Sequence, residues 1–115
     1  MTSTPKFALA AAVASLLTLG AGGAAMADDA TVALTIKDHR FSPERLEVPA
    51  NQKVTIVVSN QDASAEEFES KELKREKVIK GKSEAKILVG PLKPGEYKFF
   101  GEYHEDTAQG VLVAK

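Results

Sequence analysis

The sequence predicts an all-β protein, a small Greek-key β-sandwich, and three observations carry this prediction. Apolar residues alternate with polar ones at a period of two, which is the pattern of strands that bury one face. Turn signals rich in Pro, Gly, Asn and Asp separate these runs at short intervals. Finally, 115 residues minus a predicted leader of 27 leave 88, which is enough for one small domain. We therefore expect six to eight short strands packed as two sheets.

The first 27 residues have the pattern of a secretory signal peptide. Lys6 is their only charged residue, an apolar segment covers residues 8–19, and Ala25-Met26-Ala27 is a small-x-small cleavage site. The apolar run is short and is followed by glycines, which argues against a membrane-spanning helix, although an uncleaved anchor is the alternative. We predict export with cleavage after Ala27, so that residues 28–115 form the mature domain.

Residues 31–36 and 54–59 show the strand alternation most clearly, with Val, Leu or Ile at every second position. Between them, turn signals at Ser42-Pro43 and at residues 49–52 flank a short strand at residues 46–48. The polar segment at residues 60–62 ends the next strand. This first half of the mature chain is therefore read entirely as strands and turns.

Residues 66–77 are the ambiguous part of the chain. They are rich in helix formers, and Glu67 and Lys71 form an i, i+4 pair. The apolar residues Phe68, Leu73 and Val78 recur every five positions, however, and this spacing does not make one helical face. We predict a strand, an exposed loop and a further strand. Turns at residues 80–82 and 92–95 introduce two more strands, and residues 110–114 form the closing one.

The composition excludes several classes of function. The chain has no cysteine, and both methionines lie in the leader, so the mature protein contains no sulfur and can form neither a disulfide nor a copper–thiolate centre. Loss of Lys6 with the leader leaves 14 basic against 16 acidic residues. No basic stripe is present, so nucleic acid is not an expected partner. The charged run at residues 66–82 is read mainly as a solvated face.

The last strand and the loop after it carry the clearest chemical pattern. Tyr97 and Phe99 alternate along the strand, Gly101 ends it, His104 follows after two residues, and Gln109 comes five residues later. This segment resembles the metal loop of a cupredoxin in which glycine replaces the cysteine and glutamine replaces the axial methionine. Imidazole, carboxylate and amide ligands suit iron, Cu(II) or manganese, whereas the absent sulfur ligands select soft copper.

The resemblance extends over nearly all of the mature chain. The segments 41–50, 67–69 and 90–95 are similar to those of cupredoxin-like domains, in particular the small periplasmic proteins of bacterial iron-uptake systems. This resemblance implies a periplasmic protein that binds iron, with or without copper, ahead of a membrane iron permease or another periplasmic iron-binding protein. Some of those relatives have cysteines where this chain has Phe41 and Gly101, so electron transfer through a copper thiolate is not expected.

Six residues are candidate metal ligands. His104 and Gln109 match positions of the metal loop, Glu102 follows the missing thiolate, and His39 lies just before Phe41. Glu66 and Glu67 occupy the region of the first cupredoxin histidine, and Glu67 and Glu69 share the face of a strand opposite Phe68. The predicted set is therefore His104, Glu67, Glu69, Glu102, His39 and Gln109. For each of them, a surface polar residue without a metal is the alternative.

The predicted function is binding of iron or Cu(II) through histidine and carboxylate side chains, in support of iron uptake. Two alternatives stay open: a ferroxidase component that passes iron to a membrane permease, and a metal-free β-sandwich that only contacts partners. No Ser-His-Asp arrangement, phosphate-binding glycine loop or carboxylate pair of the glycosidase kind is recognised in the sequence. A binding protein is therefore favoured over a self-sufficient enzyme.

Overall fold

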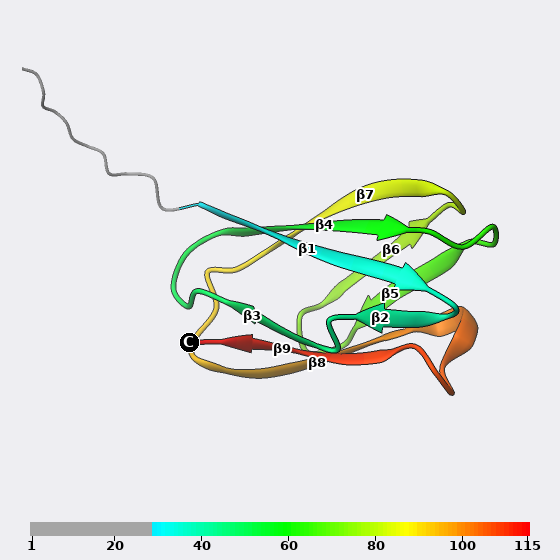
Figure 1. The fold of residues 1–115 in the computed structure, drawn as a ribbon. Coiled ribbons are helices and arrows are strands. Elements are labelled where there is room, and N and C mark those ends of the chain that lie inside the picture. The colour runs from blue at the N-terminus through cyan, green and yellow to red at the C-terminus, as the bar shows by residue number, and fades with distance from the viewer. Residues whose placement is uncertain (1–28) are drawn as a thin grey trace, which may run out of the picture.

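The computed structural model describes residues 29–115, which fold as two packed β-sheets (Figure 1). The first sheet contains β1 (Ala30–Lys37), β2 (Arg40–Ser42), β4 (Val54–Asn60) and β7 (Ser83–Val89), in the order β2-β1-β4-β7. The second contains β3 (Arg45–Val48), β5 (Glu66–Ser70), β6 (Arg75–Ile79), β8 (Gly95–Gly101) and β9 (Gln109–Ala114), in the order β3-β9-β8-β5-β6. This architecture confirms the predicted all-β sandwich.

The predicted signal peptide and its cleavage site lie outside the residues that the structure describes. The described part contains one short 3₁₀ turn, η3 (Glu102–His104). None of its helices is long and apolar enough to cross a membrane.

Nine strands are present in the described part, which is more than the six to eight expected. The difference arises at residues 40–48, where the Ser42-Pro43-Glu44 corner divides the chain into two strands. Proline has no N–H to donate to a ladder, so it interrupts pairing at this point. As a result β2 pairs with β1 in the first sheet, and β3 runs parallel to β9 in the second.

The core lies between the two sheets and follows the alternation of the strands. Residues of β4 that point inward are at most 1% exposed, and their neighbours in sequence are half-buried. Phe41, Phe68 and Phe99 form the aromatic centre of the core, with Phe99 ring centroids 5.0 Å from each of the other two. Three rings from three strands therefore join the two sheets.

Residues 66–77 adopt the predicted strand, turn and strand as β5, a turn and β6. Ser70 stabilises the turn, because its hydroxyl accepts a hydrogen bond from Leu73 N at 3.0 Å and donates one to Lys98 O at 2.6 Å. Leu73 is thereby buried, while Val78 on β6 stays 48% exposed. Tertiary contacts to β8 thus override the local helix propensity of this segment.

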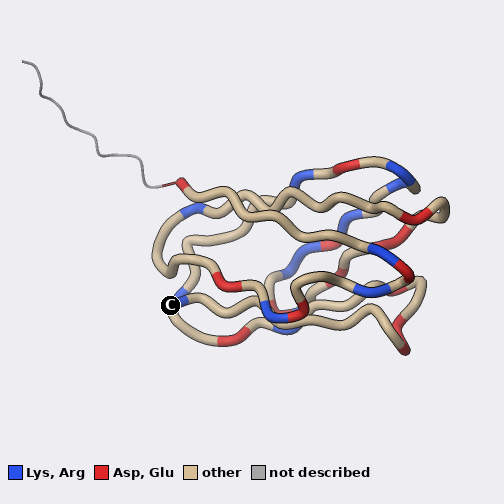
Figure 2. The backbone as a smooth tube through the Cα atoms, viewed as in Figure 1, with Lys and Arg blue, Asp and Glu red and all other residues tan. Residues whose placement is uncertain are grey.

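Strands β6 and β7 are the outermost strands on one side of the two sheets, and Figure 2 shows basic and acidic residues interspersed along them. Arg75 joins the two edges by donating a hydrogen bond from Nε to Leu88 O at 2.7 Å. Charged side chains on edge strands oppose edge-to-edge association with another molecule. This arrangement agrees with the interpretation of the charged run as a solvated face.

Candidate metal centre

A tight hairpin turn between β1 and β2 positions His39. Asp38 and His39 both have positive φ angles, 54° and 58°, as in the two-residue hairpin turns that match the twist of the sheet. The Asp62 carboxylate accepts hydrogen bonds from both backbone N–H groups, at 2.8 and 3.0 Å. The bond from the His39 backbone is the main cause that lowers the pKa of Asp62 below its usual value of 3.8. Asp62, in the connection between β4 and β5, therefore fixes the conformation of this turn.

The loop after β8 positions His104 beside this turn. His104 O accepts a hydrogen bond from Ala108 N at 2.8 Å, and Ala108 O accepts one from Gly101 N at 2.8 Å, so the loop closes onto the end of its own strand. Thr107 Oγ1 donates to His39 O at 2.6 Å and ties the loop to the β1–β2 turn. His39 and His104, 65 positions apart, consequently lie at the same end of the sandwich.

The two imidazole rings are stacked, with centroids 3.5 Å apart and planes 11° from parallel. A ring nitrogen offers its lone pair in the plane of the ring. The planes of the two rings are nearly parallel, so lone pairs lying in these planes do not converge on one point. A nitrogen of His39 and a nitrogen of His104 are therefore not directed at the same ion. The structure thus brings the two predicted histidines together, but as a stack.

The inner partner of His104 is Glu66, whose carboxylate is buried. Glu66 Oε2 lies 2.6 Å from His104 Nδ1, and the side chains are 2% and 26% exposed, respectively. Glu66 Oε1 accepts hydrogen bonds from the backbone N–H groups of Glu67 and Tyr103, both at 2.9 Å. Nδ1 and Oε2 are joined by one hydrogen bond, whose donor is set by the histidine tautomer.

Glu66 was absent from the predicted ligand set, although the sequence contained a signal for it. It lies two residues before Phe68, so strand alternation places both side chains on the same, inward face. A buried carboxylate requires partners. The sequence does not show that His104, 38 residues away, supplies one of them.

A second group of carboxylates lies on the outer face of the second sheet. Glu67 and Glu69 project outward from β5, and Glu76 stands directly opposite Glu69 on β6. One carboxylate oxygen from each of the three lies within 4.8 Å of the other two. Like charges opposite each other on neighbouring strands destabilise a sheet. These three glutamates, together with Glu102, are called the outer cluster below.

Glu102 joins this cluster from η3. A side-chain hydrogen bond with Glu102 is the main cause that raises the pKa of Glu69 to about 7, followed by burial and by the charges of its three neighbours. The pKa of Glu67 is also raised, first by burial and then by the charge of Glu102. Glu67, Glu69 and Glu102 were predicted from the sequence, whereas Glu76 was hidden within the charged run because only strand pairing places it opposite Glu69.

The raised pKa of Glu69 gives a test of the geometry of the outer cluster. Both folded and unfolded chains hold the Glu69 proton below pH 4.5, the usual pKa, but between about pH 4.5 and 7 only the folded chain retains it. Ionisation therefore favours the unfolded chain progressively as the pH rises through this window, and the penalty is constant above it. The free energy of unfolding of Glu69→Gln and of wild type is measured in urea at pH 5 and at pH 8. We expect the difference between the two to favour the variant more at pH 8 than at pH 5. The exposed Glu84→Gln serves as control, and an identical shift in both variants would contradict the proposed carboxylate coupling.

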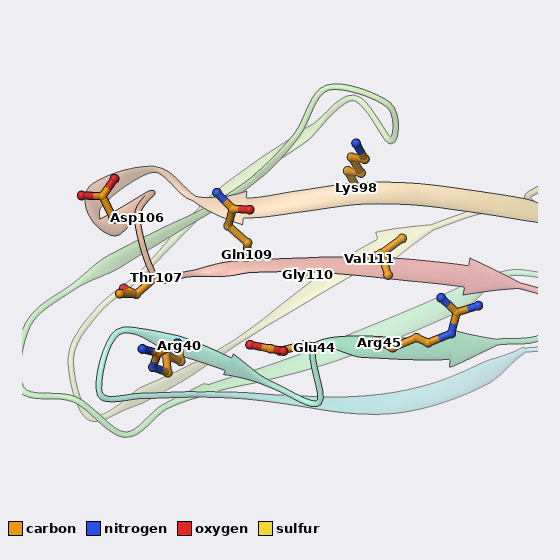
Figure 3. A pocket seen from close by; sticks show the side chains of 9 residues that line it. All are labelled: Arg40, Glu44, Arg45, Lys98, Asp106, Thr107, Gln109, Gly110 and Val111. Atoms are coloured by element: carbon orange, nitrogen blue, oxygen red, sulfur yellow. The ribbon is translucent and has the colours of Figure 1, made fainter.

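Gln109, the predicted axial residue, lies outside both groups. Its Nε2 donates a hydrogen bond to Glu105 O at 2.9 Å, so it closes the loop as a hydrogen-bonding residue. Figure 3 shows Gln109 on β9 among the residues that line a groove. The volume of this groove is about 570 Å³. Basic residues Arg40, Arg45 and Lys98 and acidic residues Glu44 and Asp106 line this groove together. With charges of both signs, it has no marked preference for an anion or a cation.

Comparison with known proteins places these features in a family. The family model of the cupredoxin-like domain matches residues 8–114. An uncharacterized protein of Rickettsia prowazekii, RP394, is 46% identical over 82 residues, which cover 71% of this chain and 66% of that protein. The chain thus spans slightly less than two thirds of the length of this curated relative.

Solved structures share the fold at low sequence identity. Auracyanin A, a "blue" copper protein from Chloroflexus aurantiacus, superposes with a TM-score of 0.64 at 16% identity, over 76% of this chain and 99% of that one. Amicyanin from Paracoccus versutus gives a TM-score of 0.59 at 11% identity, over 74% and 81% of the two chains. With a family model that covers almost its whole length, the chain belongs to the cupredoxin-like domain family.

Proposed function

We propose that this chain is an exported, periplasmic metal-binding protein that takes an iron ion on the outer cluster in support of iron uptake. The convergence of the carboxylates of Glu67, Glu69 and Glu76 within 4.8 Å is the observation that carries the proposal. Glu102 adds a fourth carboxylate from the loop that resembles a cupredoxin metal loop. Three of these four glutamates were also candidates on sequence grounds alone.

The chemistry of the donors favours a hard cation. Carboxylate oxygens suit hard cations such as magnesium, calcium and manganese. Of the two oxidation states of iron, several carboxylates around one ion stabilise Fe(III), the harder ion, more than Fe(II). A cation among these side chains would also offset the repulsion between Glu69 and Glu76, which face each other across the strands. Electrostatics and donor type thus support the same class of ligand.

A blue-copper centre does not fit the residues of this chain. No cysteine is present in the sequence, the two histidines at the end of the sandwich stack instead of converging, and Gln109 is hydrogen-bonded within the loop. The copper of the structural neighbours is therefore not transferred to this chain, and no electron-transfer role is proposed.

The position of the outer cluster suits delivery of an ion to a partner. Glu76 is exposed, while Glu67 and Glu69 are half-buried on the surface of the sheet. An ion held there remains open to ligand exchange with another protein. A membrane iron permease or a second periplasmic iron-binding protein is the partner that this proposal requires.

The proposal is tested by anaerobic Fe(II) titration of the purified mature chain, with Mn(II) as a spectroscopic probe of oxygen ligands. We expect one ion per chain, and at least a tenfold weaker affinity in Glu69→Gln and Glu76→Gln. Each variant removes one ligand charge but keeps the size of the side chain. Glu84→Gln, on the solvent face of β7, is the matched control and should bind as wild type does.

Two results would reject the proposal. One is the absence of binding to wild type at millimolar metal, which favours the metal-free interaction module. The other is equal affinity in wild type, Glu69→Gln and Glu76→Gln, which places the ion elsewhere. Oxygen consumption on addition of Fe(II) to the loaded protein separates the ferroxidase alternative from simple binding.

A further inference from the structure

We propose that Glu66 determines metal specificity by filling the interior position that a metal ion takes in other cupredoxins, so that copper is excluded there. The loop after β8 resembles a cupredoxin metal loop, in which one position carries the thiolate ligand and another the histidine ligand. Gly101 and His104 occupy these two positions in this chain. In this chain both positions face the Glu66 carboxylate. This inference does not depend on iron binding at the outer cluster.

The contact with Gly101 shows that no room is left for a thiolate. A Cβ atom at position 101 would lie 2.6 Å from Glu66 Cδ, 2.8 Å from Glu66 Oε2 and 2.7 Å from the Ala108 Cβ. Real side chains do not approach this closely, so any side chain at position 101 requires the carboxylate or the loop to move. Glycine at this position is therefore required by both Glu66 and Ala108.

The contact with His104 shows that the imidazole is already engaged. Metal ions bonded to imidazole lie about 2.0–2.1 Å from the nitrogen, as in zinc sites. The Nδ1 atom of His104 has the Glu66 oxygen at 2.6 Å instead, as a hydrogen bond. An ion at Nδ1 would have to break this hydrogen bond and push the carboxylate aside.

The remaining bonds of Glu66 resist such a displacement. Its second oxygen accepts the N–H groups of Glu67 and Tyr103, and both would lose their partner if the side chain withdrew. An N–H group that loses its acceptor without gaining another destabilises the folded chain. Within residues 29–115 no buried side-chain nitrogen or oxygen lacks a hydrogen-bond partner.

The test introduces a cysteine at position 101, either with Glu66 in place or with Glu66 replaced. Mature wild type, Gly101→Cys, Gly101→Cys with Glu66→His, and Gly101→Cys with Glu66→Ala are titrated with Co(II), which does not oxidise thiols, and then with Cu(II). Thiolate-to-metal charge-transfer absorption is the readout. We expect little or no such band in Gly101→Cys, and a strong band with at least tenfold tighter Co(II) binding in one of the two double variants. Gly101→Cys with Glu84→Ala is the matched control and should behave as Gly101→Cys does.

Two outcomes overturn the inference. The first is a thiolate band and tight binding in Gly101→Cys alone, and the second is no gain in either double variant although circular dichroism shows it folded. If the double variants do not fold, NMR of the His104 ring in wild type decides the matter. Zn(II) should leave the hydrogen bond between Nδ1 and Glu66 in place, and loss of the proton resonance of that bond on metal addition would show that Glu66 does not close the position.

The variants of this test leave all four glutamates of the outer cluster unchanged. Iron binding at the cluster is measured separately with Glu69→Gln and Glu76→Gln. Failure of the proposed function is therefore distinguishable from failure of the present inference.

Discussion

Replacement of Phe99 by alanine is expected to destabilise the domain by about 3–5 kcal/mol. Phe99 is 2% exposed, and its ring packs edge-on against Phe41 and nearly parallel to Phe68, with both centroids at 5.0 Å. It also covers Gly110, where an added Cβ would lie 2.5 Å from the ring. Three neighbours on three strands are thus fixed around the ring, so the cavity left by alanine can collapse only in part.

The loss is large against the stability of a small domain, which is about 5–15 kcal/mol. Urea unfolding followed by circular dichroism measures it, with Leu88→Ala as the control because Leu88 is 63% exposed. The control should change stability by no more than about 0.5 kcal/mol. A loss under about 1.5 kcal/mol in Phe99→Ala would contradict the central position of this ring in the core.

Truncation of Glu66 to alanine is expected to destabilise the domain by about 3–5 kcal/mol, because it leaves three hydrogen-bonding groups without their partner at about 1–3 kcal/mol each. The change removes three contacts at once, namely those to His104 Nδ1, Tyr103 N and Glu67 N. Glu66→Gln should cost less, roughly 1–3 kcal/mol, because its amide oxygen still accepts the two backbone N–H groups.

Hydrogen exchange gives the local readout of this prediction. The amides of Glu67 and Tyr103 should exchange faster in Glu66→Ala than in wild type, and largely retain their protection in Glu66→Gln. Glu84→Ala, a truncation of an exposed glutamate on β7, is the control and should leave stability within about 0.5 kcal/mol of wild type. Equal stability of Glu66→Ala and wild type would show that the buried carboxylate is not a structural link between β5 and η3.

The glutamates of β5 are divided between the interior and the surface of the domain, and this division constrains the function of the chain. Consecutive residues of a strand point to opposite faces, so Glu66 enters the interior while Glu67 and Glu69 stay outside. The inner carboxylate is hydrogen-bonded to His104, and the outer carboxylates lie close to those of Glu76 and Glu102. The sequence-based set joined His104 to the outer glutamates as one site. In the structure His104 pairs with the inner Glu66, while the oxygens of Glu67, Glu69 and Glu76 come within 4.8 Å of one another.

The sequence by itself determined the all-β sandwich, the positions of most strands, the absence of cysteine and the outward direction of Glu67 and Glu69. These properties depend on composition and on alternation along a single strand, which are local. Tertiary structure alone decided the division of residues 40–48 between two sheets, the stack of His39 on His104, the pairing of Glu66 with His104, and the arrival of Glu76 opposite Glu69. Each of these depends on the register of strands or the closure of loops far apart in the chain, and no local pattern encodes which distant residues will meet.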